Sequence, residues 1–283
     1  MRDDSQAVKR FSGLTVLVTG ATSGIGRETV GQLASAGASV LVHGRSRERV
    51  DSVVKELRAN GGDAKGVVAD LSSLAEAAQL AGDACAAAER PIDVLVNNAG
   101  VGFGQDRKRR EVSRDGLELR FAVNYLAPFV LGHELRSRRA PTRAVINVAS
   151  IGQAPLDLDD LLATRGYDGV DAYCKSKLAL IMLTFDWAAA LAPVACNALH
   201  PGTYLDTGMV RSAGIAPLGP ASRGADAILA VLGASLEDGT SGGYFDEHRP
   251  ARANQQAYDA DVRRTLHERT LEMIRPFVPR AHA

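Results

Sequence analysis

Short runs of β-branched and apolar residues recur along the chain and constrain its fold more than any other feature. They are too short for helices and too continuously apolar for strands with one exposed face. This pattern indicates strands that are covered on both sides, as in a parallel sheet. The runs lie at residues 15–18, 39–42, 66–68, 92–96, 144–148, 194–199 and 243–245.

Apolar residues at helical spacing separate these runs, for example Val30 and Leu33 ahead of Gly37. Repeated strand–helix–strand units require a mostly parallel sheet with helices on both faces. No linker-like stretch interrupts the alternation. We therefore predict an α/β fold, a single doubly wound Rossmann-type domain with its core at about 12–246 and a C-terminal helical extension at about 251–276.

The charge balance argues against nucleic acid as a partner. The 283 residues carry 33 basic and 33 acidic side chains. A phosphate backbone needs a broad positive field, which this balance does not supply. The single concentrated basic run, Arg107–Arg110, is bracketed by Asp106 and Glu111, so we interpret it as a solvated loop.

Cysteine usage and hydropathy favour a cytoplasmic protein. Cys85, Cys174 and Cys196 show neither the paired spacing of a zinc site nor the density of a disulfide scaffold, and we expect no metal. Residues 1–10 are polar, and the apolar run at 178–183 is too short for a membrane span.

A glycine-rich turn follows the first strand run and leads into the first helix. Its sequence is Thr19-Gly20-Ala21-Thr22-Ser23-Gly24-Ile25-Gly26. Strand, glycine turn and helix N-terminus in this order let backbone N–H groups approach a pyrophosphate. The alternative is a glycine-rich turn without a ligand.

The end of the second strand run indicates which dinucleotide is bound. A site for NAD commonly has an acidic residue there, but this chain has Gly44, followed by Arg45 and Ser46. Arg45 can bind a 2′-phosphate through its guanidinium group, with Ser46 as a neutral donor, which favours NADP(H). Alternatively, Arg45 is only a surface residue at the start of a helix.

Tyr173 and Lys177 are four residues apart and share one face of a predicted helix. A phenol with a pKa near 10 is a poor proton donor or acceptor at neutral pH. An ammonium group beside it favours the phenolate, so we expect Lys177 to lower the pKa of Tyr173.

Together these motifs resemble the short-chain dehydrogenase/reductase family from about Leu14 to Phe245. Tyr173–Ala179 and the long segment 151–172 are similar to the retinol dehydrogenase and WW-domain oxidoreductase branch. The resemblance is carried by Thr19-Gly20 through Gly26, Asp70-Leu71, Asn97-Asn98-Ala99-Gly100, Asn124, Ser150, Tyr173 with Lys177, and Pro201-Gly202.

The resemblance implies a catalytic set of Asn124, Ser150, Tyr173 and Lys177. Ser150 would bind the substrate oxygen, Tyr173 would transfer its proton, and Lys177 would bind the nicotinamide ribose. Asn124 would hold a water that links Lys177 to solvent. The cofactor-binding residues implied are Gly20, Thr22, Ser23, Gly24, Ile25, Gly26, Arg45, Ser46, Asp70, Leu71, Asn97, Ala99, Gly100, Tyr173, Lys177, Pro201, Gly202 and Thr203.

Within that set the resemblance gives several residues separate roles. Asp70 would contact the adenine, and Asn97 and Gly100 would lie beside the adenosine ribose. Asn98 would stabilise the central sheet instead. Pro201-Gly202-Thr203 would pass the nicotinamide carboxamide.

Two features depart from the family pattern. Asp206 stands where a threonine is usual, so Thr203 and Thr207 both remain candidates for the cofactor contact. The segment 151–172 begins and ends at the predicted active site. Its leucines and Tyr167 either line a pocket wall for a bulky, apolar substrate or pack this segment onto the body of the protein.

The predicted activity is hydride transfer between NADP(H) and a carbonyl or secondary alcohol, with a bulky apolar or aromatic ketone as the expected substrate. The first alternative is an NADPH-sensing regulator without turnover, and the second is an epimerase or dehydratase. A homodimer or homotetramer is what the resemblance implies.

Overall fold

The computed structural model describes residues 10–278, which form one sheet of seven parallel strands and an antiparallel edge strand. The strands lie in the order β3-β2-β1-β4-β5-β6-β7-β8. Every strand run predicted from the sequence overlaps a strand, although the runs at 92–96, 194–199 and 243–245 begin one or two residues before theirs. The bounds are Thr15–Val18 (β1), Ser39–Gly44 (β2), Asp63–Val68 (β3), Val94–Asn97 (β4), Ala144–Val148 (β5), Ala195–His200 (β6), Tyr244–Asp246 (β7) and Arg249–Ala251 (β8).

Both faces of the sheet are buried, which explains why the strand sequences are continuously apolar. Leu17 of β1 packs into one core, whereas Val16 and Val18 pack into the other. The alternation follows from the two-residue period of a strand. The predicted α/β fold with a mostly parallel sheet is confirmed.

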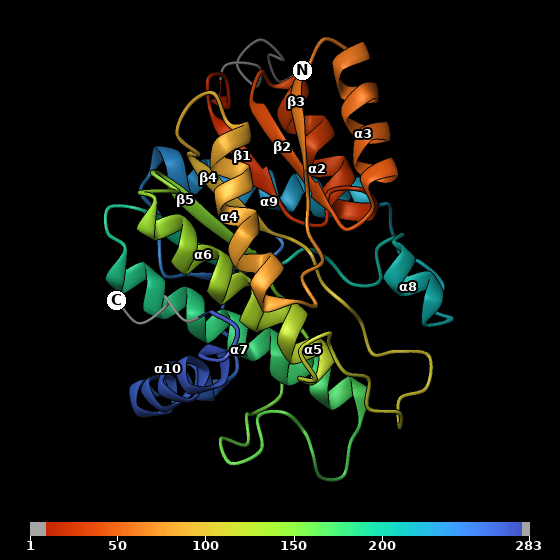
Figure 1. The fold of residues 1–283 in the computed structure, drawn as a ribbon, viewed down its shortest axis with the longest axis vertical. Helices are drawn as coiled ribbons and strands as arrows, with labels where there is room; N and C mark the ends of the chain where they lie inside the picture. Colours follow the sequence, from red (N-terminus) through yellow and green to blue (C-terminus); the bar gives the residue numbers. More distant parts are fainter. Residues whose placement is uncertain (1–9, 279–283) are drawn as a thin grey trace.

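The helices form a layer on each face of the sheet (Figure 1). Residues of α4, α6 and α7 pack on the face of Leu17, and residues of α2, α3 and α9 pack on the opposite face. The helix bounds are Gly24–Ser35 (α2), Arg47–Ala59 (α3), Leu74–Ala87 (α4), Leu119–Phe121 (α5), Ala127–Ser137 (α6), Gly169–Ala190 (α7), Gly208–Ser212 (α8), Ala221–Glu237 (α9) and Ala260–Ile274 (α10).

A π-helical turn, η1 (Ala122–Leu126), joins α5 to α6. Pro128 lies in the first turn of α6, directly after this π turn. Single π turns inside helices are frequent at functional sites. This one contains the fully buried Asn124.

The C-terminal extension consists of a 3-10 turn, η2 (Gln255–Tyr258), and α10, which packs on α7 (Figure 1). Tyr125 hydrogen-bonds Thr270 at 2.7 Å between Oη and Oγ1. The rings of Phe129 and His267 lie 5.5 Å apart. Over the described part of the chain, no helix combines the length and apolar character that crossing a membrane would need.

Candidate active site

A cleft of about 630 Å³ lies at the carboxyl ends of the parallel strands. Segments that follow β1 to β6 all contribute to its walls, so residues distant in sequence meet there. This is where ligands bind in open α/β sheets. Residues predicted to bind the cofactor that line it include Gly20, Thr22, Ser23, Gly24, Ile25, Gly26, Arg45, Ser46, Asp70, Leu71, Ala99, Gly100, Pro201, Gly202 and Thr203.

The glycine turn is packed too tightly for side chains at two positions. A Cβ atom on Gly26 would collide with the Gly20 carbonyl oxygen and the Asn98 amide. Gly20 has a positive φ of 66°, and a Cβ there would lie 2.8 Å from the Cα of Ala99. The first turn of α2 carries no acidic residue. The turn can therefore receive a pyrophosphate at the positive end of a helix.

His43, in β2, holds the backbone of the glycine turn through a hydrogen bond. Its Nδ1 accepts a hydrogen bond from Gly20 N at 3.2 Å, and its Nε2 lies 3.1 Å from the Ala69 carbonyl oxygen. Nε2 must therefore carry the proton. Burial lowers the pKa of His43 to about 4, so the ring is neutral at neutral pH.

We expect this histidine to make the protein acid-labile. Between pH 6.5 and 4, His43 is protonated in the unfolded chain but stays neutral in the folded protein. The free energy of unfolding therefore falls as pH falls, by about 1.4 kcal/mol per pH unit at most. His43→Asn keeps an acceptor for Gly20 but does not titrate. Urea unfolding across this range should show a flatter pH dependence for the variant, and equal slopes would contradict the assignment.

The end of β2 has no room for an acidic side chain. A Cβ on Gly44 would lie 2.5 Å from the Thr22 Cγ2. Arg45 and Arg49 both line the cleft beside it, and Arg49 donates to the Thr22 carbonyl at 3.4 Å. Sequence reasoning missed Arg49, although its position one helical turn after Arg45 could have indicated it. Ser46 lines the cleft, but its hydroxyl caps α3 by accepting from Arg49 N.

Two asparagines at the end of β4 differ from their expected roles. Asn97 does not line the cleft, because it belongs to β4 and donates to Asn147 Oδ1 at 2.8 Å inside the sheet. Asn98 is the one that reaches the cleft, where its Nδ2 donates to the carbonyls of Thr19 and Gly20. The structure therefore gives the sheet-stabilising role to Asn97 and a turn-holding role to Asn98.

Helix α7 brings Tyr173 and Lys177 to the cleft together with Ser150, which follows β5. The Lys177 Nζ donates to the Val148 carbonyl at 2.8 Å and lies 5.8 Å from the centroid of the Tyr173 ring. Ser150 hydrogen-bonds Tyr173, and its Oγ accepts from Gly152 N at 3.0 Å. The three side chains can thus meet one substrate oxygen and a neighbouring ribose.

The electrostatics of this group differ from the sequence prediction. Burial raises the pKa of Tyr173 and outweighs the opposing hydrogen bond from Ser150. Burial also lowers the pKa of Lys177 to about 8. The expectation that Lys177 lowers the tyrosine pKa is wrong for this structure, because desolvation dominates. A protonated phenol is the form that donates a proton to a developing alkoxide.

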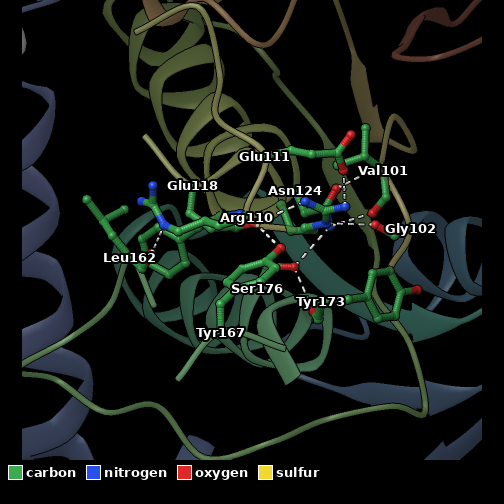
Figure 2. Close-up of polar contacts among 12 residues, drawn as sticks. Val101, Gly102, Arg110, Glu111, Glu118, Asn124, Leu162, Tyr167, Tyr173 and Ser176 are labelled. Carbon is green, nitrogen blue, oxygen red and sulfur yellow. Dashed lines mark hydrogen bonds and ion pairs between the residues drawn. The ribbon is translucent and has the colours of Figure 1, made fainter. Parts of the chain in front are cut away.

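Asn124 is fully buried, and its side-chain amide is hydrogen-bonded to neighbouring residues of the protein (Figure 2). Its Oδ1 accepts from Val101 N at 2.8 Å, and its Nδ2 donates to the Val101 carbonyl and to Ser176 Oγ. It borders Gly100, where a Cβ would lie 3.2 Å from Asn124 Oδ1 and 3.5 Å from Lys177 Nζ. Asn124 therefore holds the backbone that follows β4, at Gly100 and Val101, close to Lys177.

The segment after β6 places two threonines at the cleft but not Asp206. Thr203 Oγ1 forms a hydrogen bond with His200 Nε2 at 3.0 Å. Thr207 caps α8 and packs against Gly24. Both threonines line the cleft, whereas Asp206 is paired with Arg211.

The leucines of segment 151–172 pack onto the body of the protein. Leu156 is buried in the core, and Leu158, Leu161 and Leu162 pack against it. The alternative in which they line the pocket is wrong, because only Ile151, Gly152 and Val170 of this segment border the cleft. The apolar wall comes instead from Tyr204 and Met209 and from further residues that sequence reasoning did not single out. These are Val101, Phe103, Leu119, Val123, Cys174 and Ile215.

Comparison with known proteins agrees with this geometry. The family model of the short chain dehydrogenases matches residues 14–216. The chain belongs to this family. Its members are oxidoreductases that use a nicotinamide cofactor.

Two relatives match nearly the whole chain. A Streptomyces protein named "Putative daunorubicin C-13 ketoreductase DnrU" is 35% identical over 90% of this chain and 91% of its own length. Human retinol dehydrogenase 13 is 31% identical over 93% of this chain and 85% of its own length. Among solved structures, a blue fluorescent protein from a metagenomic library in complex with NADPH superposes with a TM-score of 0.64 and 28% identity, covering 84% of this chain and 96% of that one. The chain thus lies in the retinol dehydrogenase-like branch of the family.

Proposed function

We propose that the protein reduces the carbonyl group of a bulky, apolar or aromatic ketone with NADPH. One observation carries the proposal: Ser150, Tyr173 and Lys177 meet at one end of a cleft whose other end has two arginines and no carboxylate beside Gly44. Asp70 is the single acidic residue among the lining residues described, and it follows β3. The NADPH complex of a similar structure supports the same cofactor.

The residues of the cleft fit a dinucleotide. The glycine turn leaves the start of α2 open to a pyrophosphate, and Asp70, which lines the cleft, would contact the adenine. Lys177 would bind the nicotinamide ribose, and Thr203 or Thr207 would meet the nicotinamide end. A bound dihydronicotinamide would supply the hydride to the carbonyl carbon.

The protein's own residues handle the oxygen of the substrate. Ser150 donates a hydrogen bond to the carbonyl oxygen and aligns it with the Tyr173 Oη. As negative charge develops on that oxygen, Tyr173 donates its proton. Its raised pKa keeps the phenol protonated through neutral pH, the form that donates a proton to a developing alkoxide.

The substrate end of the cleft favours an apolar ketone. Its walls include several apolar side chains, among them Phe103, Ile151 and Met209. Ile151 is 59% exposed and Tyr204 is 42% exposed, so apolar surface continues to the mouth of the cleft. The relative named as a ketoreductase supports carbonyl reduction.

We expect the double variant Arg45→Ala/Arg49→Ala to lose its preference for NADPH. Each charge-assisted hydrogen bond to a 2′-phosphate contributes about 1.5 to 3 kcal/mol, which corresponds to about tenfold or more in affinity. The dissociation constants of NADPH and NADH should therefore converge, mainly by weaker NADPH binding. Arg47→Ala is the matched control, because Arg47 starts the same helix but does not line the cleft. A wild-type preference for NADH would overturn the cofactor assignment.

A further inference from the structure

A cluster built around a buried arginine–glutamate pair lies near the catalytic group and was not used in the function proposed above. We call Glu111, Glu118, Arg120 and Tyr167 the Arg120 cluster. The side chains of Arg120 and Glu118 are each 1% exposed. Arg120 pairs with Glu118 at 3.4 Å and with Glu111, and the Tyr167 hydroxyl donates to Glu118 at 3.0 Å. Burying ionised groups carries a large desolvation cost, so stability alone does not account for the cluster.

The guanidinium of Arg120 also holds the backbone that follows β4. Its Nε donates to the Gly102 carbonyl at 2.9 Å. The preceding residue, Val101, is held at both N and O by Asn124. Figure 2 shows Glu111, Val101 and Gly102 close together next to Asn124. Gly104 leaves room for the guanidinium, because a Cβ there would collide with it.

The next residue along this segment, Phe103, touches the proton donor. Its ring centroid lies 5.0 Å from that of Tyr173, and the two planes meet at 86°. Edge-to-face contact of this kind depends on the exact placement of both rings. The Phe103 carbonyl is packed against Gly169 at the start of α7, where a Cβ would collide with it. The backbone at Gly102 and Phe103 is therefore fixed from two sides.

We propose that Arg120 is a positioning residue that holds Phe103 against Tyr173 and so sets which ketones reach the proton donor. The inference rests on the proposed carbonyl reduction. Phe103 lines the cleft. An aromatic ketone packs on this ring while its oxygen meets Tyr173, whereas a small aliphatic ketone gains little from the ring.

The first test is a kinetic comparison of Arg120→Lys with wild type, using one aromatic and one small aliphatic ketone. Lysine keeps the charge but lacks the planar fork that reaches Glu111, Glu118 and Gly102 together. We expect KM for the aromatic ketone to rise about fivefold or more while kcat changes less than about twofold, with little change for the aliphatic ketone. A smaller fraction of folded protein would instead lower kcat for both ketones by the same factor.

Two further variants define the path of the effect. Phe103→Leu should raise the same KM, and adding it to Arg120→Lys should give much less than the product of the two changes, because both act through one ring. Arg110→Lys is the matched control. Arg110 donates to the Leu162 carbonyl at 3.0 Å, and no described hydrogen bond joins it to the segment 101–104.

The second test needs no turnover. Amide hydrogen exchange in peptides covering residues 100–107 should be faster in Arg120→Lys than in wild type and unchanged in Arg110→Lys. If Arg120→Lys does not fold, the pair Arg120→Gln/Glu118→Gln removes both buried charges together and takes its place. Unchanged exchange over 100–107, or additive effects with Phe103→Leu, would overturn the positioning role. A wild type that reduces neither ketone would sink the proposed function, and the exchange result would still decide the role of Arg120.

Discussion

Tyr173→Phe should lower kcat for ketone reduction by about 100- to 10,000-fold, the usual contribution of a positioned general acid. The substitution removes the one hydroxyl that donates a proton and keeps the ring, so the edge contact with Phe103 survives. The dissociation constant of NADPH should change less than about twofold. Rapid-mixing measurement of a single turnover separates the chemical step from product release.

A second tyrosine supplies the control for this experiment. Tyr258 lies on η2, is 40% exposed and does not line the cleft. Tyr258→Phe loses the same atom and should retain wild-type kcat. A Tyr173→Phe enzyme with more than about a tenth of the wild-type rate would remove the tyrosine from the mechanism.

Gly26→Ala should weaken cofactor binding markedly without unfolding the sheet. The added Cβ collides with the Gly20 carbonyl and with the Asn98 amide, and backbone atoms cannot move aside as a flexible side chain would. Overpacking typically costs about 1 to 3 kcal/mol. If this cost arises as a distortion of the turn that receives the pyrophosphate, NADPH affinity should fall by about 5- to 150-fold.

The same helix offers a matched control. Gly31 also lies in α2, and nothing stands within 4 Å of the position its Cβ would take. Gly31→Ala should leave NADPH binding unchanged and raise the melting temperature, because alanine favours a helix over glycine by about 1 kcal/mol. Calorimetric titration with NADPH checks both variants. Equal binding by the two would show that the tight turn has no part in holding the cofactor.

The strand pattern could be predicted from the sequence because a sheet covered on both faces needs apolar residues at consecutive positions. The edge strand β8 could not be predicted. It has three residues, Arg249, Pro250 and Ala251, and pairs along one side only, so neither alternation nor an apolar run marks it.

The motif residues were found because their spacing is local, whereas the errors concern which way a side chain points. Asn97 and Asn98 are neighbours, yet strand pairing of Asn97 with Asn147 turns the two side chains to different surroundings. The leucines from Leu156 to Leu162 carry no signal that tells a pocket wall from a core contact. Burial decided the pKa of Tyr173, and burial is a property of the fold rather than of the four-residue spacing.

Phe103 and Arg120 were missed for a related reason. Arg120 lies in sequence between the apolar residues Leu119 and Phe121. A charged side chain usually faces solvent, but this one is 1% exposed. Glu118 is a neighbour in sequence, but the fold is needed to bring Glu111 to Arg120 and Tyr167 to Glu118. Such long-range convergence leaves no trace in a local pattern.

The most direct test of the account is to mix the purified protein with NADPH and a panel of apolar and aromatic ketones and to identify the product. We predict that NADPH is consumed in equal amount to the secondary alcohol formed, that NADH supports the reaction at least about tenfold less efficiently, and that Tyr173→Phe stops turnover but not binding. Tight NADPH binding with no ketone reduced would contradict the account and favour a dinucleotide sensor.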